Sequence, residues 1–98
     1  MPSAKELERE ITLGDGESVV VVIDPAKEIG TELRDGRTTW MFPMSVEGEP
    51  AVMKGGRRLK NAMLLAGLRR WERPTKVKIT AKGAPRSFDR DYHAEVIT

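Results

Sequence analysis

The chain has 98 residues, enough for one domain with a modest core. It holds no cysteine and one histidine, which excludes disulfides, thiolate metal sites and multi-histidine centres. No apolar run approaches the roughly 20 residues of a membrane span, and the polar, mixed-charge N-terminus lacks the pattern of a signal peptide. These features predict a soluble, cytoplasmic protein that needs no cofactor and does not contact a membrane.

The net charge of +2 is unevenly distributed along the chain. Residues 1–53 hold 5 Lys and Arg against 11 Asp and Glu, a net charge of −6, whereas residues 54–98 hold 12 against 4, a net charge of +8. A small domain with this asymmetry can present a basic face to a polyanion. The alternative is a solvated surface on which the two halves neutralise each other.

Residues 1–17 are expected to form a peripheral N-terminal segment, followed by the domain proper over residues 18–98. Ser3, with Glu6 three positions later, fits the capping box of a short helix. The alternative is a strand that begins near Ile11.

The first half of the domain is rich in strand signals. Residues 18–23 include five consecutive β-branched residues, a pattern that predicts a strand covered on both faces. Asp35-Gly36 is a strong hairpin signal between residues 31–34 and 37–42. Residues 51–53 predict a further short strand.

The only strong helix signal of the second half follows Gly55-Gly56. Apolar residues recur there at helical spacing, and Gly67 is placed to end the helix. The stripe consists of Leu59, Ala62, Met63 and Ala66.

Two more strands are predicted after the helix. Residues 76–82 alternate between apolar and polar side chains, with Val77, Ile79 and Ala81 facing inward, and residues 92–97 form the last strand. We therefore predict an all-β fold with one helix: a five-stranded Greek-key barrel of the OB-fold type, with the helix between its third and fourth strands.

Several segments resemble the compact OB-fold single-stranded DNA-binding proteins of archaea, their viruses and phages. The likeness spans roughly residues 19–97, although the family's Tyr-x-Val pattern is replaced here by Tyr92-His93-Ala94, with Val96 two residues later. This resemblance implies single-strand binding by the barrel. The segments that carry it are residues 25–31, 39–44, 48–49, 54–59, 75–83 and 92–96.

Aromatic side chains are the candidates for stacking on bases. Trp40 and Phe42 share one face of a strand at a spacing of roughly 7 Å, which suits two successive bases. Trp71 lies in a basic connector, and Phe88 lies between Arg86 and Arg90 in a loop that borders the groove of an OB-fold. The alternative is that these rings fill the core, with Trp71 closing the barrel beneath the helix.

Basic side chains are the candidates for phosphate contacts. One group begins the helix and another alternates along the strand of residues 76–82. The alternatives are protection of an edge strand and simple solvation. The candidates are Lys54, Arg57, Arg58, Lys76, Lys78, Lys82 and Arg86.

Catalysis has little support in the sequence. Asp89, Asp91, His93 and Glu95 lie close together, but no second histidine or thiol completes a site. We expect neither a catalytic residue nor a metal ligand.

The sequence therefore predicts a protein that binds single-stranded DNA with little sequence preference, in replication, recombination or repair. Two alternatives stay open: an OB-fold subunit that binds proteins within a larger nucleic-acid assembly, and an RNA-binding OB domain.

Overall fold

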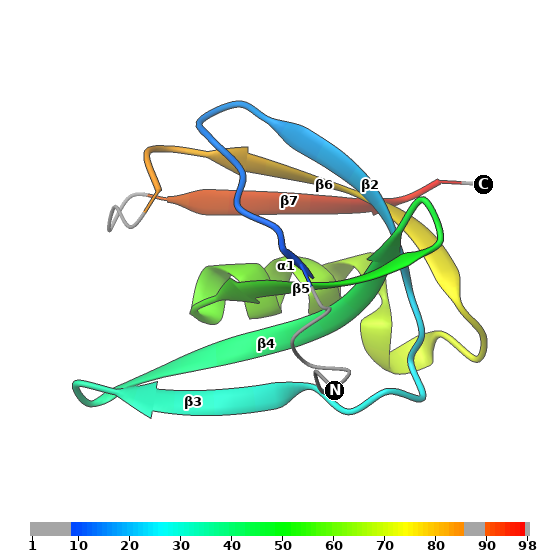
Figure 1. Ribbon diagram of the computed structural model, residues 1–98, viewed down its shortest axis with the longest axis horizontal. Coiled ribbons are helices and arrows are strands. Elements are labelled where there is room, and N and C mark those ends of the chain that lie inside the picture. Colours follow the sequence, from blue (N-terminus) through cyan, green and yellow to red (C-terminus); the bar gives the residue numbers. More distant parts are fainter. Residues whose placement is uncertain (1–8, 86–89, 98) are drawn as a thin grey trace, which may run out of the picture.

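The computed structural model describes residues 9–85 and 90–97, with Arg34 described by its backbone alone. These residues form an all-β fold with one α-helix (Figure 1). The strands are β1 (Arg9–Glu10), β2 (Ser18–Ile23), β3 (Gly30–Arg34), β4 (Arg37–Val46), β5 (Glu49–Gly55), β6 (Thr75–Lys82) and β7 (Asp91–Val96). The helix α1 (Arg57–Ala66) is followed by the 3-10 turn η2 (Leu68–Arg70).

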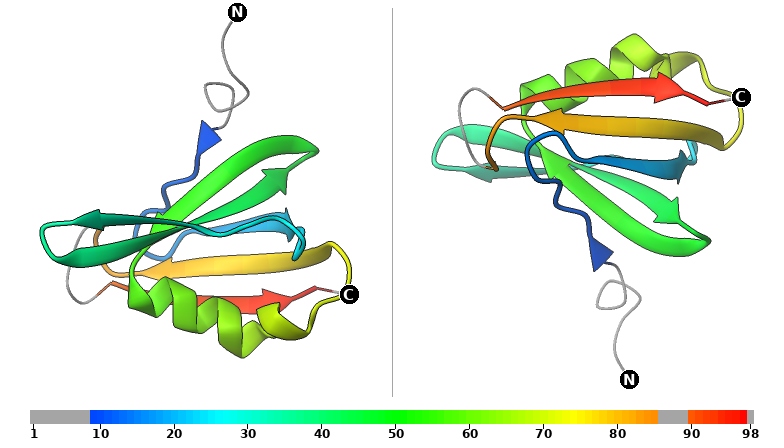
Figure 2. Two further views of the ribbon diagram at one scale, coloured as in Figure 1. Left: turned by 90° about the horizontal axis from the view of Figure 1, so that it is seen from below. Right: turned by 90° about the horizontal axis from the view of Figure 1, so that it is seen from above.

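All seven strands belong to one sheet, in the order β1-β5-β4-β2-β6-β7, with β3 paired to β4. The sheet curls so that β2, β6 and β7 lie on one side and β3, β4 and β5 on the other (Figure 1). Helix α1 lies against β7, on the side of the molecule away from β1 (Figure 2). Within the described residues β7 pairs only with β6, so the sheet is not closed by hydrogen bonds.

The described residues form seven strands rather than the five that the sequence predicts. One reason is that β2 and β3 lie along the same edge of β4. Val22 of β2 pairs with Ser45, while Gly30 to Arg34 of β3 pair with the first half of β4. The chain leaves the sheet between them at Asp24-Pro25, because proline has no donor for the ladder. The other reason is β1, which adds a short parallel pair with β5.

Two tight turns set the register of the strands around β4. Asp35 (φ 51°) and Gly36 (φ 74°) join β3 to β4, and Glu47 (φ 53°) and Gly48 (φ 83°) join β4 to β5. Positive φ at both central positions is the type I′ arrangement, whose twist matches that of the flanking strands. The predicted hairpin at Asp35-Gly36 is confirmed.

The predicted helix is also confirmed. Leu59, Ala62 and Met63 are buried, and Gly67 ends the helix in the left-handed region (φ 109°), where its N–H donates a hydrogen bond to the Leu64 carbonyl at 3.0 Å.

Within the described residues, no helix is of the length and apolarity that a membrane crossing requires.

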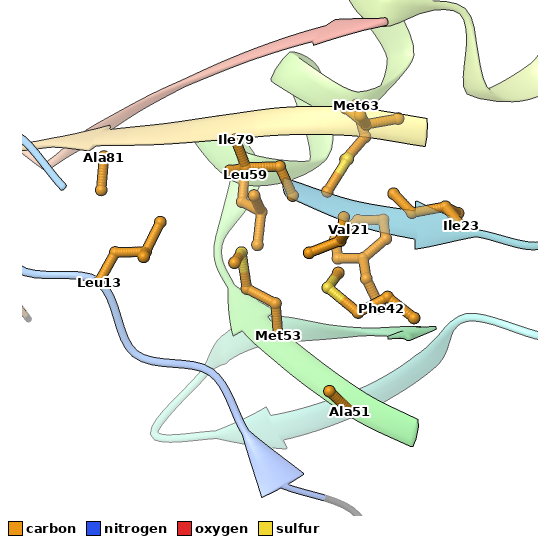
Figure 3. Close-up of a cluster of buried hydrophobic side chains, with 12 residues drawn as sticks. Leu13, Val21, Ile23, Phe42, Ala51, Met53, Leu59, Met63, Ile79 and Ala81 are labelled. Carbon is orange, nitrogen blue, oxygen red and sulfur yellow. The ribbon is translucent and has the colours of Figure 1, made fainter. Parts of the chain in front are cut away.

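The core fills the space between the two sides of the curled sheet and α1 (Figure 3). It includes Leu13, which the sequence placed in a peripheral segment. The helix suggested by Ser3 and Glu6 lies outside the described residues. Core side chains come from the segment before β2 and from β2, β4, β5, α1 and β6: Leu13, Val21, Ile23, Phe42, Met44, Ala51, Met53, Leu59, Met63, Val77, Ile79 and Ala81.

The prediction that both faces of residues 18–23 are covered is wrong. Val21 and Ile23 are buried, whereas Val20 is 41% and Val22 36% exposed. The antiparallel ladder with β6 places Val20 beside Lys78 and Val22 beside Lys76 on the outer face. The β-branched run therefore reflects strand propensity on that face rather than burial.

Candidate nucleic-acid interface

A groove of about 840 Å³ lies between the tip of the β3–β4 hairpin, the end of β5 and the start of α1. Segments far apart in the sequence meet there, including the N-terminal segment and β7. We call it the basic groove. It is lined by residues 10–13, 36–40, 53–58, 85, 90 and 92.

Positive charge dominates the described lining of the basic groove. Its five cations are Arg37, Lys54, Arg57, Arg58 and Arg90, and its single carboxylate is Glu10. The Lys54 Nζ lies 3.3 Å from Glu10 Oε1. Such a solvent-exposed pair is weak, about 0–1 kcal/mol, so an incoming polyanion can compete for Lys54.

The passage from β5 into α1 positions the basic side chains. A Cβ on Gly55 would lie 2.5 Å from Leu59 Cδ2 and 2.7 Å from Leu59 Cβ. Glycine at this position therefore allows the strand to run directly into a helix whose first turn packs Leu59 into the core. As a result Lys54 and Arg57 flank the junction, and the first turn of α1 contains no acidic residue to oppose an anion.

Arg90 holds one wall of the groove together. Its guanidinium donates to the Leu13 carbonyl, to the Gly83 carbonyl at 3.1 Å and to the Tyr92 hydroxyl at 2.7 Å. Arg58 in turn donates to the Arg90 carbonyl at 3.3 Å. Because Arg90 is committed to these bonds, its role is to position the wall, whereas Lys54 and Arg57 are exposed at the rim.

Trp40 is half-buried and lines the basic groove from β4. The Lys60 Nζ lies 4.7 Å from the centre of its ring, a cation–π contact. Lys60 itself does not line the groove. The structure thus places Trp40 in the wall of the basic groove and against the core, and its role in stacking on bases stays a prediction.

The prediction that Phe42 stacks on a base is corrected by the structure. Phe42 shares the inward face of β4 with Trp40, as predicted, but it is only 1% exposed and packs near Val21 and Ile23 in the core (Figure 3). A fully buried ring cannot stack on a base. The alternative of a core residue applies to Phe42.

Trp71 also lies away from the basic groove. It follows η2, is half-buried, and packs against the core. Its indole lies against Gly67, where an added Cβ would be 3.1 Å from Nε1. This packing agrees with the alternative that Trp71 closes one end of the fold beneath the helix. Trp71 also lines a second cavity.

The lysines of β6 lie on the outer face of the sheet and do not line the basic groove. Lys78 is directly opposite Glu95 of β7, and Lys82 is directly opposite Asp91. Lys76 is opposite Val22 of β2. The structure therefore does not unite Lys76, Lys78 and Lys82 with Lys54, Arg57 and Arg58 in one phosphate-binding surface.

Arg86 and Phe88 lie outside the described residues. The chain on either side of them, Pro85 and Arg90, borders the basic groove. Within residues 9–85 and 90–97, no three side chains of His, Asp or Glu gather where they could hold a metal ion.

Three basic or aromatic residues that line the groove were not among the sequence candidates: Arg37, Arg90 and Tyr92. The sequence held a signal for Arg37, because a residue that directly follows a two-residue turn lies at the hairpin tip. The roles of Arg90 and Tyr92 depend on long-range contacts to Leu13 and Gly83, which no local pattern reveals.

Comparisons of the chain with protein-family models, curated proteins and solved structures found no match in any of the three.

Proposed function

We propose that the chain is an OB-fold protein that binds single-stranded DNA with little sequence preference. The observation that carries this proposal is the basic groove: cations and a half-buried tryptophan converge in one open cavity that has a single described carboxylate.

The strand order supports the OB-fold part of the proposal. If β2 and β3 are taken as one strand interrupted at Pro25, the order β5-β4-(β2,β3)-β6-β7 matches a five-stranded Greek-key barrel whose closing pair, β5 with β7, is open. Helix α1 follows β5 and lies against β7, as expected for the helix between the third and fourth strands of such a barrel.

The contents of the groove support the nucleic-acid part. Single-strand binding needs cations that follow the backbone and a flat ring on which a base can stack. Arg37, Lys54 and Arg57 supply the cations, and Trp40 supplies the ring. The Lys60 ammonium lies over the indole and the ring also packs against the core, so a base would meet the part of Trp40 that lines the groove.

This division of roles explains why little sequence preference is expected. Phosphate contacts carry no base information, and every base offers a π-face to Trp40.

The test is the binding of a fluorescein-labelled dT12 oligonucleotide, followed by anisotropy at two salt concentrations. We expect binding that weakens steeply with salt, because each phosphate contact releases counterions. Absence of binding, or affinity that does not change with salt, would refute the proposal. Competition by matched unlabelled dT12 and rU12 distinguishes a DNA-binding from an RNA-binding domain.

A further inference from the structure

A second cavity, of about 400 Å³, adjoins the basic groove at Trp40. It is bounded by the segment that separates β2 from β3, by β4 and by α1 with η2. Among the described residues, Trp40 is the one that lines both cavities. The volume lies near the lower end of small-molecule sites, roughly 300–1,000 Å³, which suits one nucleotide rather than a length of strand.

The walls of the second cavity are apolar and aromatic. Trp40 and Trp71 contribute indoles, Leu64 and Leu68 line the helical side, and Ile29 lines the opposite side. Ile29 is 39% exposed even though it is a large apolar side chain. A flat, apolar ligand would pack against both rings and cover exposed apolar surface.

Charge surrounds these walls. Lys27, Lys60 and Arg69 line the second cavity, against a single described carboxylate, Asp24. Asp24 Oδ1 accepts a hydrogen bond from the Ala26 N–H at 2.9 Å, which holds the carboxylate at the turn. Three cations against one anion favour a ligand that carries a phosphate, and the apolar walls favour a ligand that carries a ring.

We infer that the second cavity holds one nucleotide of the same strand that occupies the basic groove, with its base turned away from the neighbouring bases of that strand. This inference rests on the proposed function. Continuity supports it: a strand that stacks a base on Trp40 is already at the boundary of the second cavity. The base packs against Trp71 and Leu64, and its phosphate meets Lys60 and Arg69.

The first arm of the test fills the cavity. Leu64→Phe adds volume to its wall, while Leu65→Phe places the same ring one position along α1 on a residue that is 85% exposed and lines neither cavity. We expect Leu64→Phe to weaken dT12 binding by roughly 5- to 150-fold, the loss of one stacked base. Leu65→Phe should bind as the parent chain does. Equal binding by the two variants would overturn the inference.

The second arm reports on the cavity directly, and its first measurement does not use the filled variant. In a Trp40→Phe chain the remaining tryptophan is Trp71, which lines the second cavity and not the groove. We expect dT12 to quench its fluorescence, and Leu64→Phe added to this background to abolish the quenching.

The outcomes separate the two proposals. Salt-dependent binding of dT12 by anisotropy with no change in Trp71 fluorescence would overturn the second cavity as a nucleotide site and leave the basic groove intact. No binding of dT12 in any assay would overturn both.

Discussion

Two regions of this small protein carry rows of basic side chains, and their surroundings differ. In the basic groove, five cations share the described lining with one carboxylate and with the half-buried ring of Trp40. On the outer face of β6, Lys78 and Lys82 each face a carboxylate across the ladder to β7. The neighbour of Lys78 on its other side is Val20 of β2, which offers no aromatic face.

The difference shows that the position of a charge in the fold matters more than its density along the chain. A lysine opposite a glutamate contributes little net field at a distance, because the two charges largely cancel. Cations that converge on a cavity from three segments add their fields. We therefore expect the groove, and not the outer face, to govern binding.

The largest effect should come from the core that supports both regions. Phe42→Ala removes a fully buried ring, so we expect a loss of about 3–5 kcal/mol in the free energy of unfolding. Urea denaturation followed by circular dichroism measures this loss. Phe42→Leu, which keeps most of the apolar contact, should lose less. Unchanged stability of Phe42→Ala would mean that the ring is not part of the core.

Trp40 tests the groove itself. Trp40→Ala removes the proposed stacking surface, so binding of dT12 should weaken by about 1–3 kcal/mol. Anisotropy with labelled dT12 measures it, and Trp40→Phe serves as the control that keeps an aromatic face. If alanine binds as tightly as phenylalanine does, the ring is not a stacking surface.

A matched pair of double variants compares the two basic regions. Lys54→Gln with Arg57→Gln should reduce the slope of log K against log salt by about 0.7 for each phosphate that the protein no longer neutralises. Lys76→Gln with Lys78→Gln removes the same charge from the outer face and should leave the slope unchanged. Anisotropy titrations over a series of salt concentrations measure both slopes. A reversed pattern would place the binding surface on β6 and β7.

The smallest effect should come from the acidic residues of the two regions. Glu10→Gln removes the one described carboxylate of the groove and frees Lys54, so dT12 affinity should rise by less than about 1 kcal/mol. Glu95→Gln removes the partner of Lys78 on the outer face and should not change affinity. Isothermal titration calorimetry at low salt measures the dT12 affinity of both variants. A gain in affinity for Glu95→Gln alone would contradict the expectation that the groove governs binding.

Local signals in the sequence predicted much of the fold. The hairpin at Asp35-Gly36, the helix after Gly56 and its end at Gly67 each depend on a few neighbouring residues, and each is confirmed. The number of strands was not predictable in the same way. It depends on which segments pair with β4 and β5, and some of these partners are distant in sequence, such as Ala51 opposite Arg9.

The candidate site was predicted only in part, for the same reason. Alternation along β4 correctly placed Trp40 and Phe42 on one face. It could not show that Phe42 is fully buried in the core whereas Trp40 is only partly buried against it. Alternation along β6 likewise placed the lysines outward, but not opposite the carboxylates of β7.

The hydrogen bond from the Arg90 guanidinium to the Leu13 carbonyl joins segments near the two ends of the described chain. A second hydrogen bond runs from the Gly16 N–H to the Ala81 carbonyl at 2.8 Å. Contacts so distant in sequence make folding slow, because a long loop must close before they form. During synthesis, the wall of the groove cannot assemble until the ribosome has released Arg90. We therefore expect this wall to form late in folding, with the β3–β4 hairpin and α1 as the parts able to form earlier.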